Sequence, residues 1–268
     1  MLRAALTVTL SALVATATHA GPPIARFQTV LGDFDVVLDP EAAPISVSNF
    51  TAYANRGAYT DTFIHRSTTY NPTGIQIVQG GGFGVVTTNI VSVPADPPIP
   101  LEAGLPNSRG TLAMARTSDP DSATSQWYFN VTDNPGLDFN YAVFGQVIGT
   151  GISVVEAIAS IPSYDASPLL GPTFGELPLL NPSLVATNLI VIESVRVEAF
   201  AITNITRTGN TTELRWTALS TNTPVRVERT EDLASGSWTH LATNLTTGIF
   251  TDTNAPTRTS FYRIVTEP

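Results

Sequence analysis

The chain of 268 residues contains no cysteine, and all 13 of its basic residues are arginine. Without cysteine it has no disulfides, thiolate nucleophiles or cysteine-based zinc sites, and no attachment point for a lipoprotein anchor. The formal net charge is −9. Because an acidic surface repels phosphate backbones, nucleic acid is not an expected partner.

Histidine is also scarce, with three in the whole chain. His65 and His240 lie in different expected domains, which argues against a histidine-based triad or a multi-histidine metal site. The glycine-rich run 80–84 lacks the loop–helix pattern that cradles a phosphate. We therefore expect neither a metal ion nor a cofactor.

Long apolar runs are absent except at the N-terminus. Arg3 is followed by a mostly apolar stretch, and Thr18-His19-Ala20 offers a small–x–small cleavage site. We expect residues 1–20 to be a signal peptide and the mature protein to be exported, either to the periplasm or to the medium. No later segment has the ~20 consecutive apolar residues that a membrane span needs.

Short apolar and β-branched runs predict a mainly β protein. Helices are predicted only at 44–55, opened by a proline, and at 153–160, where apolar residues share one face. Strands are expected at 26–30, 34–38, 75–78, 111–115, 127–131, 141–147 and 189–197. This pattern favours a closed antiparallel β-barrel with the two short helices over its ends.

Two segments stand apart from this pattern. Residues 162–186 are proline-rich and without periodicity, which is typical of an insertion or a functional lid. Residues 200–268 contain short strand signals separated by turn residues, expected at 213–218, 225–229, 238–242 and 261–265. We predict a main domain at 21–199 and, at 200–268, a small β-sandwich roughly like a fibronectin type III module.

Five sequence blocks follow one another in the main domain. They are Phe63-Ile64-His65-Arg66, Ile77-Val78-Gln79-Gly80-Gly81, the stretch Arg109 to Arg116, Ser125-Gln126-Trp127-Tyr128-Phe129-Asn130, and Leu137-Asp138 with Tyr141-Ala142-Val143-Phe144-Gly145. In this order, over about residues 24–198, the chain closely resembles the cyclophilin family. The resemblance implies a peptidyl-prolyl cis–trans isomerase that acts on X–Pro bonds without a covalent intermediate.

The resemblance also implies a role for each matching residue. Arg66 matches the catalytic arginine, Gln126 the glutamine that binds the peptide backbone, and Gln79 the glutamine that supports the arginine. The matches to the proline pocket and the peptide groove are Ile77, Tyr128, Leu137, Tyr141, Met114, Ala115 and Arg116. His65 is expected to hold the turn beside Arg66 rather than to transfer protons.

Three features depart from the family pattern. The loop from Ser67 is longer than usual, so either Ile75 or Gln76 takes the place of a large pocket phenylalanine. Tyr128 stands where a phenylalanine is usual, and Gly136 where a tryptophan or phenylalanine commonly lies.

Two functions follow. The first is an isomerase that assists the folding of exported, proline-containing polypeptides. The alternative is a catalytically weak or inactive module that binds proline peptides and is tethered by the C-terminal domain to an unknown partner. The protein is expected to be a monomer. If Arg66 lies open beside Gln126, catalysis is favoured; if segment 67–75 or 162–186 fills the groove, binding or regulation is favoured.

Overall fold

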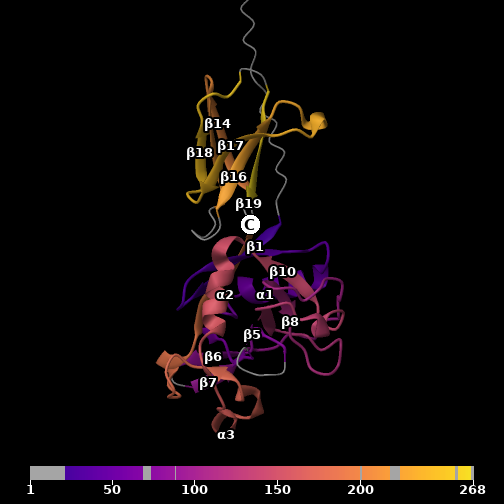
Figure 1. Cartoon of the computed structure of the whole chain (residues 1–268), viewed down its shortest axis with the longest axis vertical. Helices are drawn as coiled ribbons and strands as arrows, with labels where there is room; N and C mark the ends of the chain where they lie inside the picture. The colour runs from indigo at the N-terminus through magenta and orange to yellow at the C-terminus, as the bar shows by residue number, and fades with distance from the viewer. Residues whose placement is uncertain are drawn as a thin grey trace, which may run out of the picture.

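The computed structural model describes residues 22–68, 74–87, 89–199, 201–217, 224–256 and 259–266. The predicted signal peptide lies outside these described residues. Figure 1 shows β14 and β16–β18 at one end of the molecule, and the large sheet with α1, α2 and α3 toward the other. In the described ranges, no helix combines the length and apolar character needed to cross a membrane.

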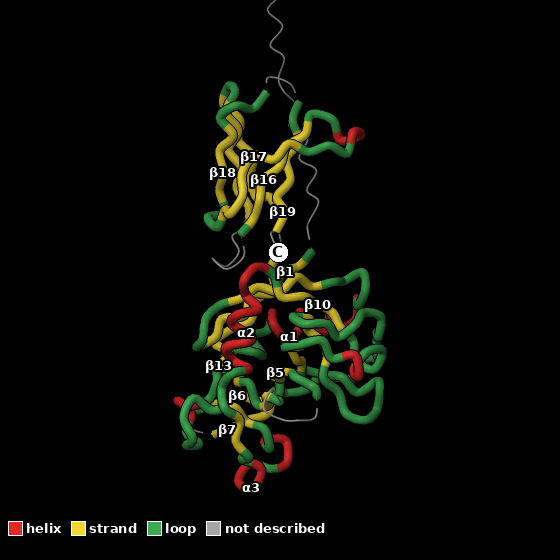
Figure 2. The backbone as a smooth tube through the Cα atoms, viewed as in Figure 1, coloured by secondary structure: helices red, strands yellow, loops and turns green. Residues whose placement is uncertain are grey.

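Among the described residues, eleven strands form one sheet, and helices take up a small part of the backbone in Figure 2. In spatial order the strands are β4 (Arg66–Ser67), β5 (Ile77–Gly80), β9 (Trp127–Asn130), β8 (Thr111–Met114), β10 (Val143–Val147), β2 (Phe34–Leu38), β1 (Pro23–Thr29), β13 (Val191–Ala199), β3 (Thr62–Phe63), β6 (Phe83–Val86) and β7 (Asn89–Ser92). Every ladder in it is antiparallel. The mainly β prediction is confirmed, and each predicted strand is present within a few residues.

The prediction of a closed barrel is wrong for the hydrogen-bonded sheet. Its described strands end at β4 on one side and β7 on the other, without a ladder that joins them. β4 is only two residues long, and the Ser67 amide donates to the Glu176 carbonyl at 2.9 Å. Glu176, from the proline-rich segment 162–186, therefore lies beside β4 where a strand that closed the barrel would have to pair.

One face of this sheet packs on the main core. Phe27 lies against Phe34, Phe50, Trp127 and Phe129, with ring centroids 5.0–6.0 Å apart. Phe50 comes from α1 (Pro44–Asn55), which begins with a proline and is followed by Gly57 at φ +72°. α2 (Ile152–Ala159) adds Val155 and Ile158 to the same core. Both predicted helices are confirmed.

The proline-rich segment 162–186 is more ordered than its composition indicates. It contains β11 (Ser163–Tyr164), α3 (Ser167–Leu170), a 3-10 turn at Pro172–Phe174 and β12 (Leu177–Pro178). β11 and β12 pair with each other, and Phe174 packs against Phe63 and Phe83. This segment, which we call the insertion, has an apolar cluster of its own.

The C-terminal residues form two three-stranded sheets. One contains β14 (Ile202–Thr208), β15 (Thr211–Trp216) and β18 (Ile249–Asp252), and the other contains β17 (Thr239–Leu245), β16 (Val225–Thr230) and β19 (Phe261–Thr266). Leu214, Trp216, Val225 and Val227 form a common core, against which Ile24 of β1 also packs. The sequence predicted four of these strands and missed β14 and β18.

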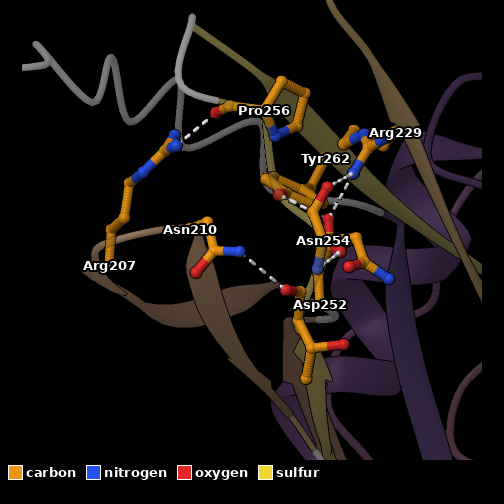
Figure 3. A network of polar contacts seen from close by, with 8 residues as sticks. Arg207, Asn210, Arg229, Asp252, Asn254, Pro256 and Tyr262 are labelled. Carbon is orange, nitrogen blue, oxygen red and sulfur yellow. Dashed lines mark hydrogen bonds and ion pairs between the residues drawn. The ribbon is translucent and has the colours of Figure 1, made fainter.

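A polar network joins the two C-terminal sheets (Figure 3). The Asp252 carboxylate accepts hydrogen bonds from Nη1 of Arg229 at 2.6 Å, from the Tyr262 hydroxyl at 2.9 Å and from the backbone N–H of Asn254 at 3.0 Å. Arg207 donates to the Pro256 carbonyl nearby. Asp252 ends β18, whereas Arg229 and Tyr262 belong to β16 and β19, so the carboxylate holds the sheets together.

We expect Asp252→Ala to lower the free energy of unfolding of the C-terminal sheets by ~2 kcal/mol, because it leaves a mostly buried guanidinium without its carboxylate. Urea unfolding followed by tryptophan fluorescence measures the change. Glu213→Ala is the control, since it breaks a more exposed ion pair with Arg215 and should cost less than ~0.5 kcal/mol. Equal losses in the two variants would contradict the role assigned to Asp252.

Candidate functional site

Strand register places a row of side chains on the face of the sheet opposite the main core. Residues directly opposite each other in an antiparallel pair point to the same side, and neighbours along a strand point to opposite sides. Val78, Trp127 and Phe129 point into the main core. The residues that alternate with them form a row across five strands: Arg66, Gln79, Tyr128, Ala113 and Val143.

An apolar cluster lies along this row, and we call it the Tyr128 cluster. Its buried members are Ile77, Ala113, Tyr128, Leu137 and Val143, and Ile75, Leu105, Ala115 and Tyr141 pack against them at partial exposure. The structure therefore brings together six of the residues predicted for the proline pocket and the peptide groove, from four separate parts of the sequence.

The Tyr128 hydroxyl, which the sequence places near an apolar site, has a partner. It donates to Oδ1 of Asn107 at 2.7 Å, and Asn107 is itself buried. Asn130 donates to the same oxygen, and Asn134 donates to Asn130. Burial, with a smaller effect from neighbouring Tyr141, raises the pKa of Tyr128, so the phenol stays neutral. Sequence reasoning missed Asn107, because nothing in the sequence ties it to Tyr128.

The remaining predicted groove residues divide between two environments. Arg116 lies over the Tyr141 ring, with Cζ 4.6 Å from its centroid, and its Nε donates to the Asn140 carbonyl at 2.8 Å. Met114, by contrast, packs in the main core and is almost fully buried. The prediction that its side chain lines the groove is wrong, since it points to the opposite face from Ala113 and Ala115.

The structure also separates the two candidates for the missing phenylalanine. Ile75 packs against the Tyr128 cluster. The Gln76 backbone instead exchanges hydrogen bonds with the Asn134 side chain, at 3.0 and 3.1 Å. Ile75 is therefore the residue whose side chain extends this apolar surface.

The two predicted glutamines are joined to each other. Nε2 of Gln79 donates to Oε1 of Gln126 at 2.9 Å. The prediction that Gln79 supports Arg66 through its side chain does not match this contact. The two residues are backbone partners in the β4–β5 ladder, while the Gln79 amide fixes Gln126.

Arg66 has a different partner, Glu176 of the insertion. Nε of Arg66 donates to Oε2 of Glu176 at 2.8 Å. The Arg66 side chain is 43% exposed and that of Glu176 22%. The arginine therefore keeps access to solvent while one edge of its guanidinium is held by a carboxylate. Sequence reasoning missed this residue, which is 110 positions further along the chain.

His65 is fully buried beside Arg66, and its ring meets Phe83 edge-on at 5.0 Å. Burial lowers the pKa of His65 to about 4, with the Arg66 charge acting in the same direction. The nearby Gln126 amide opposes this shift, but neither ring nitrogen has a hydrogen bond of ordinary geometry within the described residues. The imidazole is thus neutral near pH 7 and structural.

The chemistry available here is non-covalent. A guanidinium and a fixed primary amide adjoin an apolar cluster, which suits a polypeptide segment with a compact apolar ring. Within the described ranges, no group of three or more acidic or histidine side chains could hold a metal ion. These features are suited to binding a peptide segment through an apolar surface and directed hydrogen bonds.

Comparison with known proteins identifies the class. Residues 24–173 match the family described as "Cyclophilin type peptidyl-prolyl cis-trans isomerase/CLD". The chain is 42% identical over 163 residues to a peptidyl-prolyl cis-trans isomerase of Acinetobacter baylyi, covering 58% of this chain and 82% of the relative. It is 41% identical over 160 residues to peptidyl-prolyl cis-trans isomerase A of Dickeya dadantii, covering 57% and 77%. For isomerase B of Escherichia coli the identity is 39% over 145 residues, covering 50% and 83%.

The chain therefore belongs to the cyclophilin-type peptidyl-prolyl cis–trans isomerase family and is an enzyme of that class. The family match ends at residue 173, so both Glu176 and the two C-terminal sheets lie beyond it.

The low pKa of His65 predicts a specific acid sensitivity. An unfolded histidine binds a proton below about pH 6.5, whereas the folded one does so only near pH 4. Between these values the unfolded chain holds the extra proton, so the free energy of unfolding falls as the pH falls, by up to ~3 kcal/mol in total. Urea unfolding at pH 7, 5.5 and 4.5 measures this loss.

In His65→Leu the free energy of unfolding should fall less between pH 7 and pH 4.5, because this variant has no imidazole at position 65 that binds a proton on unfolding. His240→Leu, which removes an exposed histidine of β17, is the control variant. If His65→Leu keeps the full pH dependence of the parent, the assignment of the loss to His65 is wrong.

Proposed function

We propose that this enzyme turns X–Pro peptide bonds of exported proteins between cis and trans, with Arg66 stabilising the twisted amide. The observation that supports this most is the row of side chains across β4, β5, β9 and β8. It carries Arg66 on β4 and Tyr128 two strands away on β9, which is about 10 Å across a sheet, and the rest of the apolar cluster surrounds Tyr128.

The physical requirement is modest. Rotation about the peptide bond meets a barrier of ~18–20 kcal/mol because twisting breaks the amide resonance. The prolyl nitrogen then regains a lone pair, which a fixed N–H donor stabilises more in the twisted state than in the planar one. Arginine suits this role, since it stays charged and presents a rigid fork of donors. No bond is broken, so no nucleophile, metal or cofactor takes part.

The other residues hold the peptide. Ile77, Tyr128 and Leu137 would receive the proline ring, and Ile75 would extend that apolar wall. Gln126 would bind the peptide backbone, with Gln79 keeping its amide in place through the 2.9 Å bond. The groove on either side is proposed to be lined by Ala115, Arg116 and Tyr141.

We also propose the division of the chain. Residues 1–20 would be a signal peptide that directs the protein to the periplasm or the medium. Residues 21–199 would be the isomerase domain of a monomer. Residues 200–268 would be a β-sandwich of fibronectin type III type that contacts an as yet unknown partner. The two sheets with a common core and the network at Asp252 support the sandwich.

A second candidate function is a module that binds X–Pro segments with little turnover. Two observations favour it. Glu176 occupies one edge of Arg66. Gly136 provides no aromatic wall beside Leu137, and a Cβ added there would have no neighbour within 4 Å. In this reading the C-terminal sheets would tether the module to its partner.

Arg66→Ala tests the choice between the two functions. We expect the purified chain to accelerate cis-to-trans isomerisation of a short Ala-Pro peptide, and Arg66→Ala to reduce kcat/KM ~10²-fold, the usual effect of losing a preorganised donor. Nuclear magnetic resonance exchange measurements follow both turnover and binding. Arg109→Ala is the matched control, because it removes another arginine of the same domain, paired with Glu156 on the surface. Binding without acceleration by a folded parent would overturn the isomerase in favour of the binding module.

Gly82→Ala tests the placing of Gln126. A Cβ at Gly82 would lie 2.8 Å from Cδ and 2.9 Å from Nε2 of Gln126, so this flexible side chain has to move away from Gln79. We expect kcat/KM to fall about tenfold, since small displacements of a positioning group are costly, while unfolding changes little. Gly104→Ala, where the new Cβ has no neighbour within 4 Å, should keep the parent's activity. Unchanged activity in Gly82→Ala would remove Gln126 from the proposed machinery.

A further inference from the structure

We propose that Glu176 of the insertion is a positioning residue for Arg66: its carboxylate holds Nε, so that the terminal nitrogens of the guanidinium face the peptide. This inference rests on the proposed function, in which Arg66 acts on the X–Pro bond. It assigns a role to Glu176, a residue that lies past the end of the family match at residue 173.

The insertion holds Glu176 firmly at this place. The Glu176 carbonyl accepts from the Ser67 amide at 2.9 Å, directly beside Arg66. Next along the chain, Leu177 is fully buried and pairs with Tyr164. Ser67 is also held through its carbonyl, which accepts a hydrogen bond from the Ser163 hydroxyl at 2.9 Å. The backbone on both sides of the ion pair is therefore hydrogen-bonded.

Side-chain packing adds to this anchor. Phe174, two residues before Glu176, stacks on Phe63 with centroids 6.4 Å apart and meets Phe83 at 4.7 Å. Ala166, Leu177, Leu179 and Leu189 complete the buried cluster. Because these contacts fix the backbone of the insertion, the carboxylate of Glu176 has little freedom to leave Arg66.

The contact leaves the arginine usable. A guanidinium has five N–H donors, one on Nε and four on the terminal nitrogens. Within the described residues, the hydrogen bond recorded for Arg66 uses Nε. The terminal nitrogens carry the other four donors, and the side chain is 43% exposed. The contact therefore fixes the orientation of the long, flexible Arg66 side chain and leaves it accessible to a peptide.

This ion pair is more buried than the surface ion pairs of the same part of the chain, of which Arg109–Glu156 is one. In the Arg109–Glu156 pair the carboxylate side chain is 41% exposed, against 22% for Glu176. Exposed ion pairs between flexible side chains contribute little to stability and do little to fix the orientation of either side chain. The partly buried carboxylate on an anchored backbone is the arrangement expected of a group that orients its partner.

The opposite role, a carboxylate that blocks Arg66, makes the opposite prediction. If Glu176 positions Arg66, then Glu176→Ala lowers kcat about tenfold or more, as misplacement of a reacting group does, and changes KM less than about twofold. Glu176→Gln keeps an acceptor oxygen for Nε, so it should recover most of kcat. If Glu176 is a block, Glu176→Ala raises kcat/KM instead.

The experiment measures kcat and KM for an Ala-Pro peptide in the parent, Glu176→Ala, Glu176→Gln, Arg66→Ala and the double variant with both alanines. The double variant should be no slower than Arg66→Ala alone, because a positioning residue has nothing to position once Arg66 is gone. Glu156→Ala is the control, since it breaks an arginine ion pair away from the site and should leave kcat unchanged.

The outcomes separate this inference from the proposed function. If the parent protein has no isomerase activity, both the proposed function and the positioning role of Glu176 are wrong. An active parent that depends on Arg66 but not on Glu176 overturns the positioning role alone, as does a faster Glu176→Ala. Additive losses in the double variant also overturn it, because they mean that Glu176 acts through the general stability of the insertion.

Discussion

The hydrogen-bonded register of β4, β5, β9 and β8 is the constraint on which the site depends. A shift of one residue in any of these strands would turn its side chains to the other face. Arg66 would then enter the core, or Trp127 would leave it. The aromatic core around Phe27 holds the register, because Trp127 and Phe129 pack there, so core and site are opposite faces of the same strands.

The glycine run 80–82 shows how closely the two faces are linked. A Cβ at Gly80 would lie 2.7 Å from the Trp127 ring, and one at Gly81 would lie 2.6 Å from its Nε1 and 2.7 Å from the Ser125 carbonyl. Gly80 and Gly81 are therefore required by the packing of the Trp127 side chain in the main core. Gln126, the residue before β9, lies against Gly82, which leaves its side chain room. The position of Gln126 therefore depends on the close packing of the neighbouring glycines against Trp127.

The sequence predicted local features well and distant contacts poorly. Alternation and turn residues placed seven of the eleven strands of the large sheet and both main helices, but missed the short strands β3 and β4 and the hairpin of β6 and β7. The family pattern gathered Ile77, Tyr128 and Leu137 into one cluster. It did not predict the side on which Met114 lies, because a match to a motif says nothing about the pleat. Nor did it predict Asn107 or Glu176. Each of these depends on a loop brought back against the sheet, and loop paths are not encoded by periodicity.

The pairing of Arg66 with a carboxylate also bears on what the arginine supplies. Glu176 offsets most of the positive charge of Arg66 at a distance, so attraction of acidic peptides is not its contribution. The peptide is uncharged at the X–Pro bond in both its planar and twisted states, and what changes is a lone pair on nitrogen. A directed N–H group senses that change at short range, whereas net charge senses it weakly. An ion pair that balances the charge of Arg66 and fixes the direction of its guanidinium is thus compatible with the proposed catalysis. The condition is that the carboxylate binds Nε and leaves the terminal N–H groups to the substrate.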